Sequence, residues 1–173
     1  MGPTVRTARL DDAEAMGRIH VESWQAAYVG VVPRAHLDAL DGEERASNWR
    51  DAIATNPEPD HGRRLVVEVD GEVVGLALVV PDRDGEDGVG EIPIIYVHPT
   101  AWGTGAGRAL MLECEAEFQR RGFTQAVLWV LEDNPRARRF YERQGWHVDG
   151  GRKVEDIGGT ELAEVRYRRV FSG

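Results

Sequence analysis

Residues Ile94 to Leu110 read IIYVHPTAWGTGAGRAL, and this is the most informative stretch of the chain. An apolar run typical of a strand passes through a Pro and a Trp into three alternating glycines, and a helical pattern follows at once. Residues without side chains let the backbone turn tightly and approach a ligand, and the first turn of a helix presents free N–H groups at the positive end of its dipole. The stretch therefore predicts a phosphate-binding loop. Close packing of a strand on a helix is the alternative explanation of the same glycines.

The chain has 173 residues, of which 42% are hydrophobic, and this size predicts a single domain over residues 1–173. Its formal net charge is −9. An acidic balance disfavours nucleic acid as a partner and favours cationic substrates through long-range attraction. A need for solubility explains the charge equally well.

No run of residues approaches the roughly 20 apolar positions that a membrane-spanning helix needs, and the N-terminal MGPTVRTARLDD lacks the apolar centre of a signal peptide. We therefore expect a cytoplasmic protein without a membrane partner. The single cysteine, Cys114, falls on the apolar face of a predicted helix and suits the core. No metal site is predicted, because the five histidines have no ligand spacing: His20, His36, His61, His98 and His147.

Apolar periodicity and turn residues predict a mixed α/β fold. Helices are expected from near Asp11, Pro33 and Asp41, over Thr104–Arg121, and from Asn134 to Gly145, and a loop over Asn56–Gly62. Pro93 cannot donate a ladder hydrogen bond, so a bulge or an unpaired stretch is expected there. The strands are expected at Thr4–Arg9, Leu65–Val69, Glu72–Val80, Glu91–Val97, Ala126–Leu131, Trp146–Ile157 and Glu161–Val170.

Two motifs in a fixed order carry a resemblance to the GCN5-related N-acetyltransferase (GNAT) superfamily. These are YVHPTAWGTGAGRAL and, after one helix and one strand, NPRARRFYERQGW. The acetyl-CoA signature of that family is Arg or Gln, two residues, Gly, one residue, then Gly or Ala. It falls here on Trp102, Gly105 and Gly107, so the first position departs from the pattern. The resemblance spans roughly Arg6 to Tyr167.

The resemblance implies a single, mostly antiparallel mixed sheet flanked by helices and splayed between its fourth and fifth core strands. Acetyl-CoA would be the cosubstrate, with no metal. Its pantetheine arm would pair with the backbone near Ile95 and Val97, Asn134 would bond the arm, and Trp102 would frame the loop. The diphosphate would lie on the amides of Gly103, Thr104, Gly105, Ala106, Gly107 and Arg108.

The same resemblance implies catalytic roles for two residues. An acceptor amine must be neutral to attack a thioester, and the departing thiolate is best protonated as it leaves. Tyr141 matches the family's usual general acid, and Glu91 matches relatives that deprotonate the amine through a Glu, directly or through water. On periodicity alone Tyr141 is a core residue beside Phe140, and a Glu at a strand end is usually solvated.

We place the acceptor site on the first helix, at Trp24 and Tyr28, because aromatic rings attract a cationic amine. The helical core is the alternative for both. The acceptor is predicted to be a primary amine, either a small molecule or a peptide N-terminus. Because C-terminal hairpins pair subunits in relatives, a homodimer is also expected.

Two other functions fit parts of this sequence. A dinucleotide-dependent oxidoreductase would need G-x-G-x-x-G, but counting from Gly103 places Arg108 at the third glycine, and counting from Gly105 places Leu110 there. A non-catalytic acyl-CoA sensor on the same fold is the other rival, and the fold alone does not exclude it. The presence of both Glu91 and Tyr141 favours an enzyme, an acyl-CoA-dependent N-acyltransferase.

Overall fold

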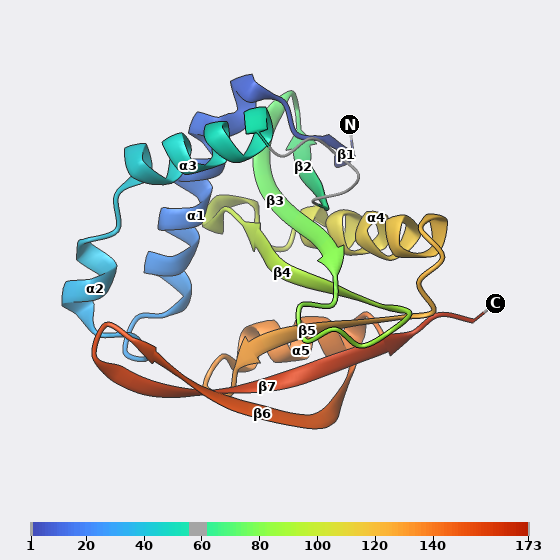
Figure 1. Ribbon diagram of the computed structural model, residues 1–173. Helices are drawn as coiled ribbons and strands as arrows, with labels where there is room; N and C mark the ends of the chain where they lie inside the picture. The colour runs from blue at the N-terminus through green and yellow to red at the C-terminus, as the bar shows by residue number, and fades with distance from the viewer. Residues whose placement is uncertain (1, 56–61, 173) are drawn as a thin grey trace.

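The computed structural model describes residues 2–55 and 62–172, so all of the predicted 56–62 loop but Gly62, and with it His61, lies outside the described residues. One sheet of seven strands has the order β1-β2-β3-β4-β5-β7-β6 (Figure 1). Its strands are β1 (Thr4–Thr7), β2 (Arg63–Val69), β3 (Glu72–Pro81), β4 (Val89–Val97), β5 (Gln125–Leu131), β6 (His147–Ile157) and β7 (Thr160–Val170). The helices are α1 (Ala13–Ala27), α2 (Arg34–Asp38), α3 (Gly42–Thr55), α4 (Ala106–Arg120) and α5 (Pro135–Arg143), with short 3-10 turns η1 (Leu10–Asp12) and η2 (Pro99–Ala101).

The turns form where the sequence predicts them. Asp70 and Gly71 join β2 to β3 with φ values of 52° and 84°, which is the backbone that a two-residue hairpin requires. Asn134 caps α5 by accepting the Ala137 N–H at 3.1 Å, and Pro135 occupies the first helical position. Local sequence therefore sets both the antiparallel start of the sheet and the position of α5.

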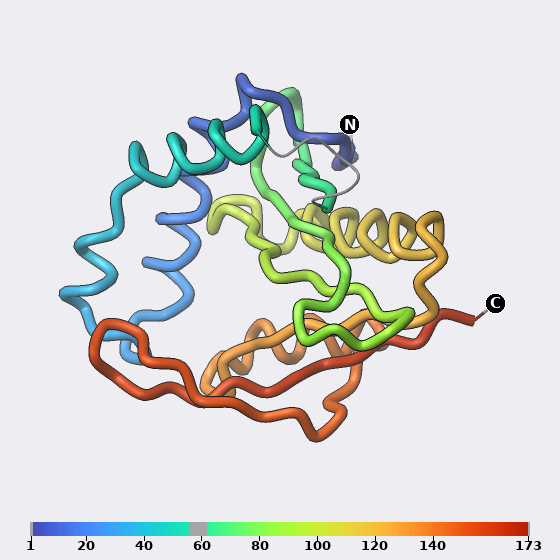
Figure 2. Tube along the Cα trace, viewed as in Figure 1, coloured from blue at the N-terminus to red at the C-terminus, as the bar shows by residue number. Residues whose placement is uncertain are grey.

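Helices cover both faces of the sheet (Figure 2). The core on one face packs Met16 and Ile19 of α1 and Trp49 of α3 against β2 and β3. On the other face α4 and α5 pack over a larger core, whose fully buried side chains include Phe118 and Trp146. Alternate residues of the strands thus supply two separate apolar layers.

The sheet opens between β4 and β5. These two strands run parallel and pair only at Val89, Gly90 and Glu91 of β4, after which they separate. At the Pro93 position the single residue Val79 of β3 faces two residues of β4, which is the predicted bulge. The expected fold, a mixed sheet splayed between its fourth and fifth strands, is confirmed.

The boundaries differ from the prediction by a few residues. Strand β4 begins at Val89, two residues before the predicted start, and α4 begins at Ala106 because the preceding glycines take left-handed backbone. Among the described residues, no helix is both long and apolar enough to cross a membrane.

Candidate active site

The glycine loop ends at the N-terminus of α4. Gly103 and Gly105 have φ values of 79° and 93°, and the left-handed Gly105 is the N-cap. The first intrahelical bond at this end is donated by the Ala109 N–H to the Gly105 carbonyl, so the amides of Gly107 and Arg108 have no backbone acceptor among the described residues. The loop therefore presents donors to solvent, as an anion site requires.

A cavity of about 720 Å³ lies over this loop and α5. Of the predicted loop residues, Trp102, Gly103, Gly105, Gly107 and Arg108 line it. Two predicted residues do not: Thr104 donates its hydroxyl to the Ala101 carbonyl at 2.6 Å, and Ala106 is fully buried. We call this cavity the basic groove.

Four arginines line the basic groove, and no described acidic residue does. Arg136, Arg139 and Arg143 lie on one face of α5 at spacings of three and four, and Arg108 faces them from α4. None of the four forms an ion pair with a described residue, whereas Arg138 on another face of α5 bonds the Tyr167 hydroxyl. In a chain of net charge −9 this is a concentrated positive surface. Sequence reasoning missed it, although the helical spacing of these arginines was visible.

Trp102 is held between β4 and α5. Its indole N–H donates to the Val97 carbonyl at 2.8 Å, and the Arg136 guanidinium carbon lies 3.2 Å from the centre of its ring. Ser23 also donates to the Val97 carbonyl, at 3.2 Å. Two side chains thus occupy this carbonyl, which leaves the N–H as the backbone group of Val97 that can pair with a ligand.

The backbone N–H and C=O of Ile95 and the N–H of Val97 remain available for pairing with a ligand. The His98 N–H bonds Val74 of β3 at 2.7 Å. Because alternate backbone groups of a strand point to opposite sides, those of Ile95 and Val97 point toward the opening between β4 and β5. The splay thus offers unpaired backbone groups beside the groove.

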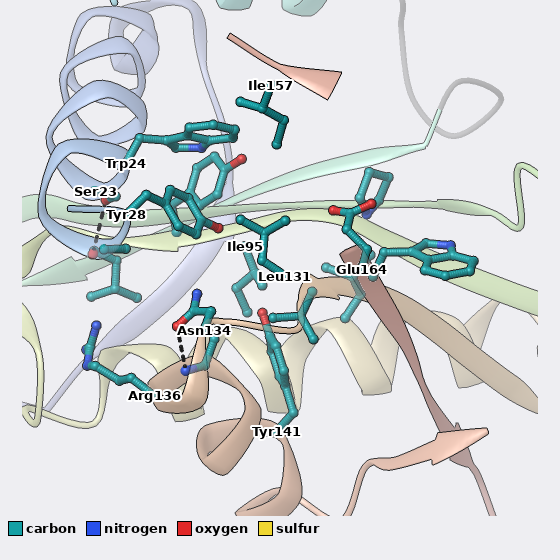
Figure 3. A pocket seen from close by; sticks show the side chains of 18 of the residues that line it. Ser23, Trp24, Tyr28, Ile95, Leu131, Asn134, Arg136, Tyr141, Ile157 and Glu164 are labelled. Atoms are coloured by element: carbon teal, nitrogen blue, oxygen red, sulfur yellow. Dashed lines mark hydrogen bonds between the residues drawn. The ribbon is translucent and has the colours of Figure 1, made fainter. Parts of the chain in front are cut away.

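A second cavity, of about 240 Å³, lies in this opening, and we call it the aromatic pocket (Figure 3). Tyr141 enters from α5, and Trp24 and Tyr28 enter from α1 and its C-terminus on the opposite face of the sheet. Asn134 also lines it. The two cavities adjoin, and we call them together the passage. They share six lining residues: Ile95, Val97, Trp102, Arg136, Ala137 and Tyr141.

Tyr141 lies where the two cavities meet. Tyr141 is 8% exposed. Figure 3 shows its hydroxyl pointing into the pocket, where it makes no hydrogen bond with a described residue. Burial is the main cause that raises the pKa of this phenol above its ordinary value of 10. The hydroxyl is therefore protonated at neutral pH and free to donate.

Glu91 lies elsewhere. It is 2% exposed and lines neither cavity. Arg83 holds both carboxylate oxygens, through its Nη2 at 2.6 Å and its Nε and backbone N–H at 3.0 Å each. The structure does not bring Glu91 together with Tyr141, and it pairs this buried carboxylate with an Arg83 side chain that is 60% exposed.

Glu164 of β7 is the acidic residue that lines the aromatic pocket, and sequence reasoning missed it. Its side chain is 18% exposed and forms an ion pair with Lys153 at 3.3 Å. Burial raises the pKa values of Tyr28 and Tyr96, and the charge of Glu164 adds to both shifts. Period-two alternation places Leu162, Glu164 and Arg166 on one face of β7, but that pattern alone does not indicate a pocket.

The remaining reactive side chains lie outside the passage. Cys114 is fully buried, and burial raises the pKa of its thiol. His98 bonds Glu22 through Nε2 and Thr100 through Nδ1. Over residues 2–55 and 62–172 no group of three metal-ligating side chains comes together.

Comparison with known proteins identifies the family. The model of the acetyltransferase (GNAT) family matches residues 18–146. The chain belongs to this family. YuaI of Bacillus subtilis (strain 168), an uncharacterized N-acetyltransferase, is 31% identical over 171 residues, which cover 98% of this chain and 91% of that protein.

Solved structures of GNAT proteins share the fold. PaiA N-acetyltransferase from Thermoplasma acidophilum, solved in complex with coenzyme A, has a TM-score of 0.77 at 20% identity, covering 99% of this chain and 100% of that one. YncA from Salmonella typhimurium, solved with acetyl-CoA, has a TM-score of 0.70 at 22% identity, covering 100% and 96%. At these identities the likeness establishes the architecture.

Proposed function

We propose that this GNAT protein transfers the acetyl group of acetyl-CoA to a primary amine, a small molecule or a peptide N-terminus. The observation that carries the proposal is the passage through the sheet. It is basic at the groove, aromatic and acidic at the pocket, and has the Tyr141 hydroxyl at the junction. A polyanionic donor and a cationic acceptor would enter from opposite ends.

The basic groove suits the phosphates of acetyl-CoA. Free amides at the start of α4 and the arginines opposite them form charge-assisted hydrogen bonds to phosphate oxygens. Arg136, stacked on Trp102, supplies a cation next to the position where the family signature has Arg or Gln. The pantetheine arm would then pair with Ile95 and the Val97 N–H, beside Asn134.

Transfer is proposed to be direct. The acceptor ammonium first loses a proton to water. The neutral amine then attacks the thioester carbonyl, the nitrogen–carbon bond forms, and the carbon–sulfur bond breaks as Tyr141 donates its proton to the leaving sulfur. The nitrogen of the new amide gives up a proton through water to the Tyr141 phenolate, which restores the phenol. Two observations support this: structures of the same fold contain CoA or acetyl-CoA, and the Tyr141 phenol of this chain faces the opening. The burial of Cys114 argues against an acetyl-enzyme intermediate.

The proposal changes the role expected of Glu91. A proton would have to reach it through waters around the Arg83 guanidinium, since its carboxylate lines neither cavity. We propose that Glu91 fixes the loop after β3, and that Trp24 and Tyr28 face the acceptor. The homodimer stays a prediction.

The test is release of free thiol from acetyl-CoA over a panel of amines and peptide N-termini, with the products identified by mass. Thiol release that depends on an amine supports the proposal. Binding of acetyl-CoA without turnover on any amine would favour a sensor. Thermal stabilisation by NADH but not by acetyl-CoA would revive the oxidoreductase.

A further inference from the structure

The chain contains one lysine among its 173 residues, and that lysine lies next to the aromatic pocket. Lys153 of β6 pairs directly with Glu164 in the antiparallel ladder to β7. Its Nζ lies 3.3 Å from Glu164 Oε2 and 4.7 Å from the centre of the Trp129 ring. Glu164 and Trp129 both line the pocket, whereas Lys153 does not.

Lys153 shows what this wall of the pocket binds. The charged Lys153 side chain ends in a primary alkylammonium group, which contacts both the Glu164 carboxylate and the Trp129 indole ring. Burial lowers the pKa of Lys153, but the carboxylates of Glu155 and Glu164 outweigh that effect, so its pKa lies above the ordinary value. The surroundings therefore stabilise a charged amine.

Glu164 has capacity for another cation. Among the described residues its carboxylate forms an ion pair only with Lys153, whose amine also pairs with Glu155 at 3.2 Å. Glu155 does not line the pocket. If Lys153 turns to Glu155, the Glu164 carboxylate is left facing a cavity walled by aromatic rings, and an unpaired carboxylate there favours a cation.

We propose that Glu164 is a specificity-determining residue that binds the ammonium group of the acceptor, with Trp129 beside it and Lys153 displaced toward Glu155. The acceptor is then a cationic primary amine whose apolar body contacts the aromatic side chains of the pocket, among them Trp24. The identification of the bound cation as the acceptor substrate rests on the proposed function. The binding of a cation at Glu164 can be measured without turnover.

The binding experiment uses (2-phenylethyl)trimethylammonium, which carries the charge and cannot be acetylated. Calorimetric titration into the CoA-loaded protein should give a dissociation constant at least tenfold weaker for Glu164→Gln than for wild type. The matched control is Glu161→Gln, which removes an exposed carboxylate of the same strand outside the pocket and should stay within twofold. Glu155→Gln should weaken binding, because it removes the carboxylate that receives Lys153. Lys153→Met frees Glu164 and should tighten binding severalfold.

The kinetic experiment compares 2-phenylethylamine with aniline, which is uncharged at neutral pH. Glu164→Gln should raise KM for 2-phenylethylamine at least tenfold, change kcat less than threefold, and leave KM for aniline unchanged.

Different results would overturn the cation site at Glu164 and the acetyltransferase function. Equal binding of the probe by wild type, Glu164→Gln and Glu161→Gln, or no binding by wild type, overturns the assignment of Glu164. Selective loss of probe binding in Glu164→Gln, together with no thiol release from any amine, would support the cation site and refute the acetyltransferase.

Discussion

Replacing Tyr141 with Phe removes one oxygen atom at the junction of the two cavities. That hydroxyl makes no hydrogen bond with a described residue, and the ring keeps its neighbours Phe140 and Tyr167, whose centroids lie 5.5 Å and 6.0 Å away. The folding free energy should therefore change by less than about 0.5 kcal/mol. A general acid contributes about 100-fold or more, so kcat should fall by about 100-fold, equivalent to about 2.7 kcal/mol of activation free energy.

The matched control is Tyr167→Phe. The Tyr167 hydroxyl is buried, donates to Glu142 at 2.8 Å and accepts from Arg138 at 3.1 Å. Losing it should lower stability by about 1–2 kcal/mol and leave kcat within about twofold. Thiol-release assays measure the change in kcat, and thermal unfolding measures the change in stability. Unchanged kcat in Tyr141→Phe, or equal loss of kcat in both variants, would refute Tyr141 as the acid.

The pH profile gives an independent check on the same hydroxyl. Because burial raises the pKa of Tyr141, the folded protein keeps the phenol protonated at pH values where a free tyrosine ionises. The rate should rise with pH as the acceptor amine loses its proton, and it should not fall near pH 10. A falling limb near pH 10 that disappears in Tyr141→Phe would show an ordinary phenol pKa and contradict the burial argument.

Three further substitutions separate structural from ligand-binding roles. Glu91→Gln should keep kcat within about threefold yet lower stability by about 1 kcal/mol, because the buried carboxylate loses its bonds to an Arg83 side chain that is itself 60% exposed; a 100-fold loss of kcat at unchanged stability would restore it as the base. Arg136→Ala should raise KM for acetyl-CoA about tenfold and weaken the salt dependence of that KM. The control Arg34→Ala, at an exposed arginine, should change neither. An equal KM for the two variants would show that Arg136 does not bind acetyl-CoA. Gly105→Val should abolish acetyl-CoA binding in calorimetry, whereas Gly122→Val, with a similar φ of 82° but far from the groove, should only destabilise the fold; normal binding by Gly105→Val would show that the loop does not hold the phosphates.

Most of the fold could be predicted because its signals are local. Asp70-Gly71 fixes a hairpin, Asn134-Pro135 begins a helix, and the glycines before α4 stop a strand and start a helix within a few residues. Pro93 predicts the bulge because it lacks an N–H. Each of these features depends on backbone chemistry that one or two residues decide.

The site could be predicted only in part, because its walls come from elements that are distant in sequence. Tyr141 and the glycine loop were found through motifs. Glu164 was not, since only the β5–β7 pairing brings it to the pocket. Glu91 shows the opposite limit: its position in the strand matched a catalytic pattern, but a charge partner eight residues earlier, Arg83, holds it in the interior. Such pairings depend on tertiary packing, which spacing does not encode.

A crystal structure of the protein with acetyl-CoA tests the central claim most directly, that one passage brings donor and acceptor together at Tyr141. The account predicts the diphosphate on the amides at the start of α4, the pantetheine arm beside Ile95 and Val97, and the thioester sulfur within hydrogen-bond reach of the Tyr141 hydroxyl. Acetyl-CoA bound outside the basic groove, or a sulfur facing away from that hydroxyl, would contradict it.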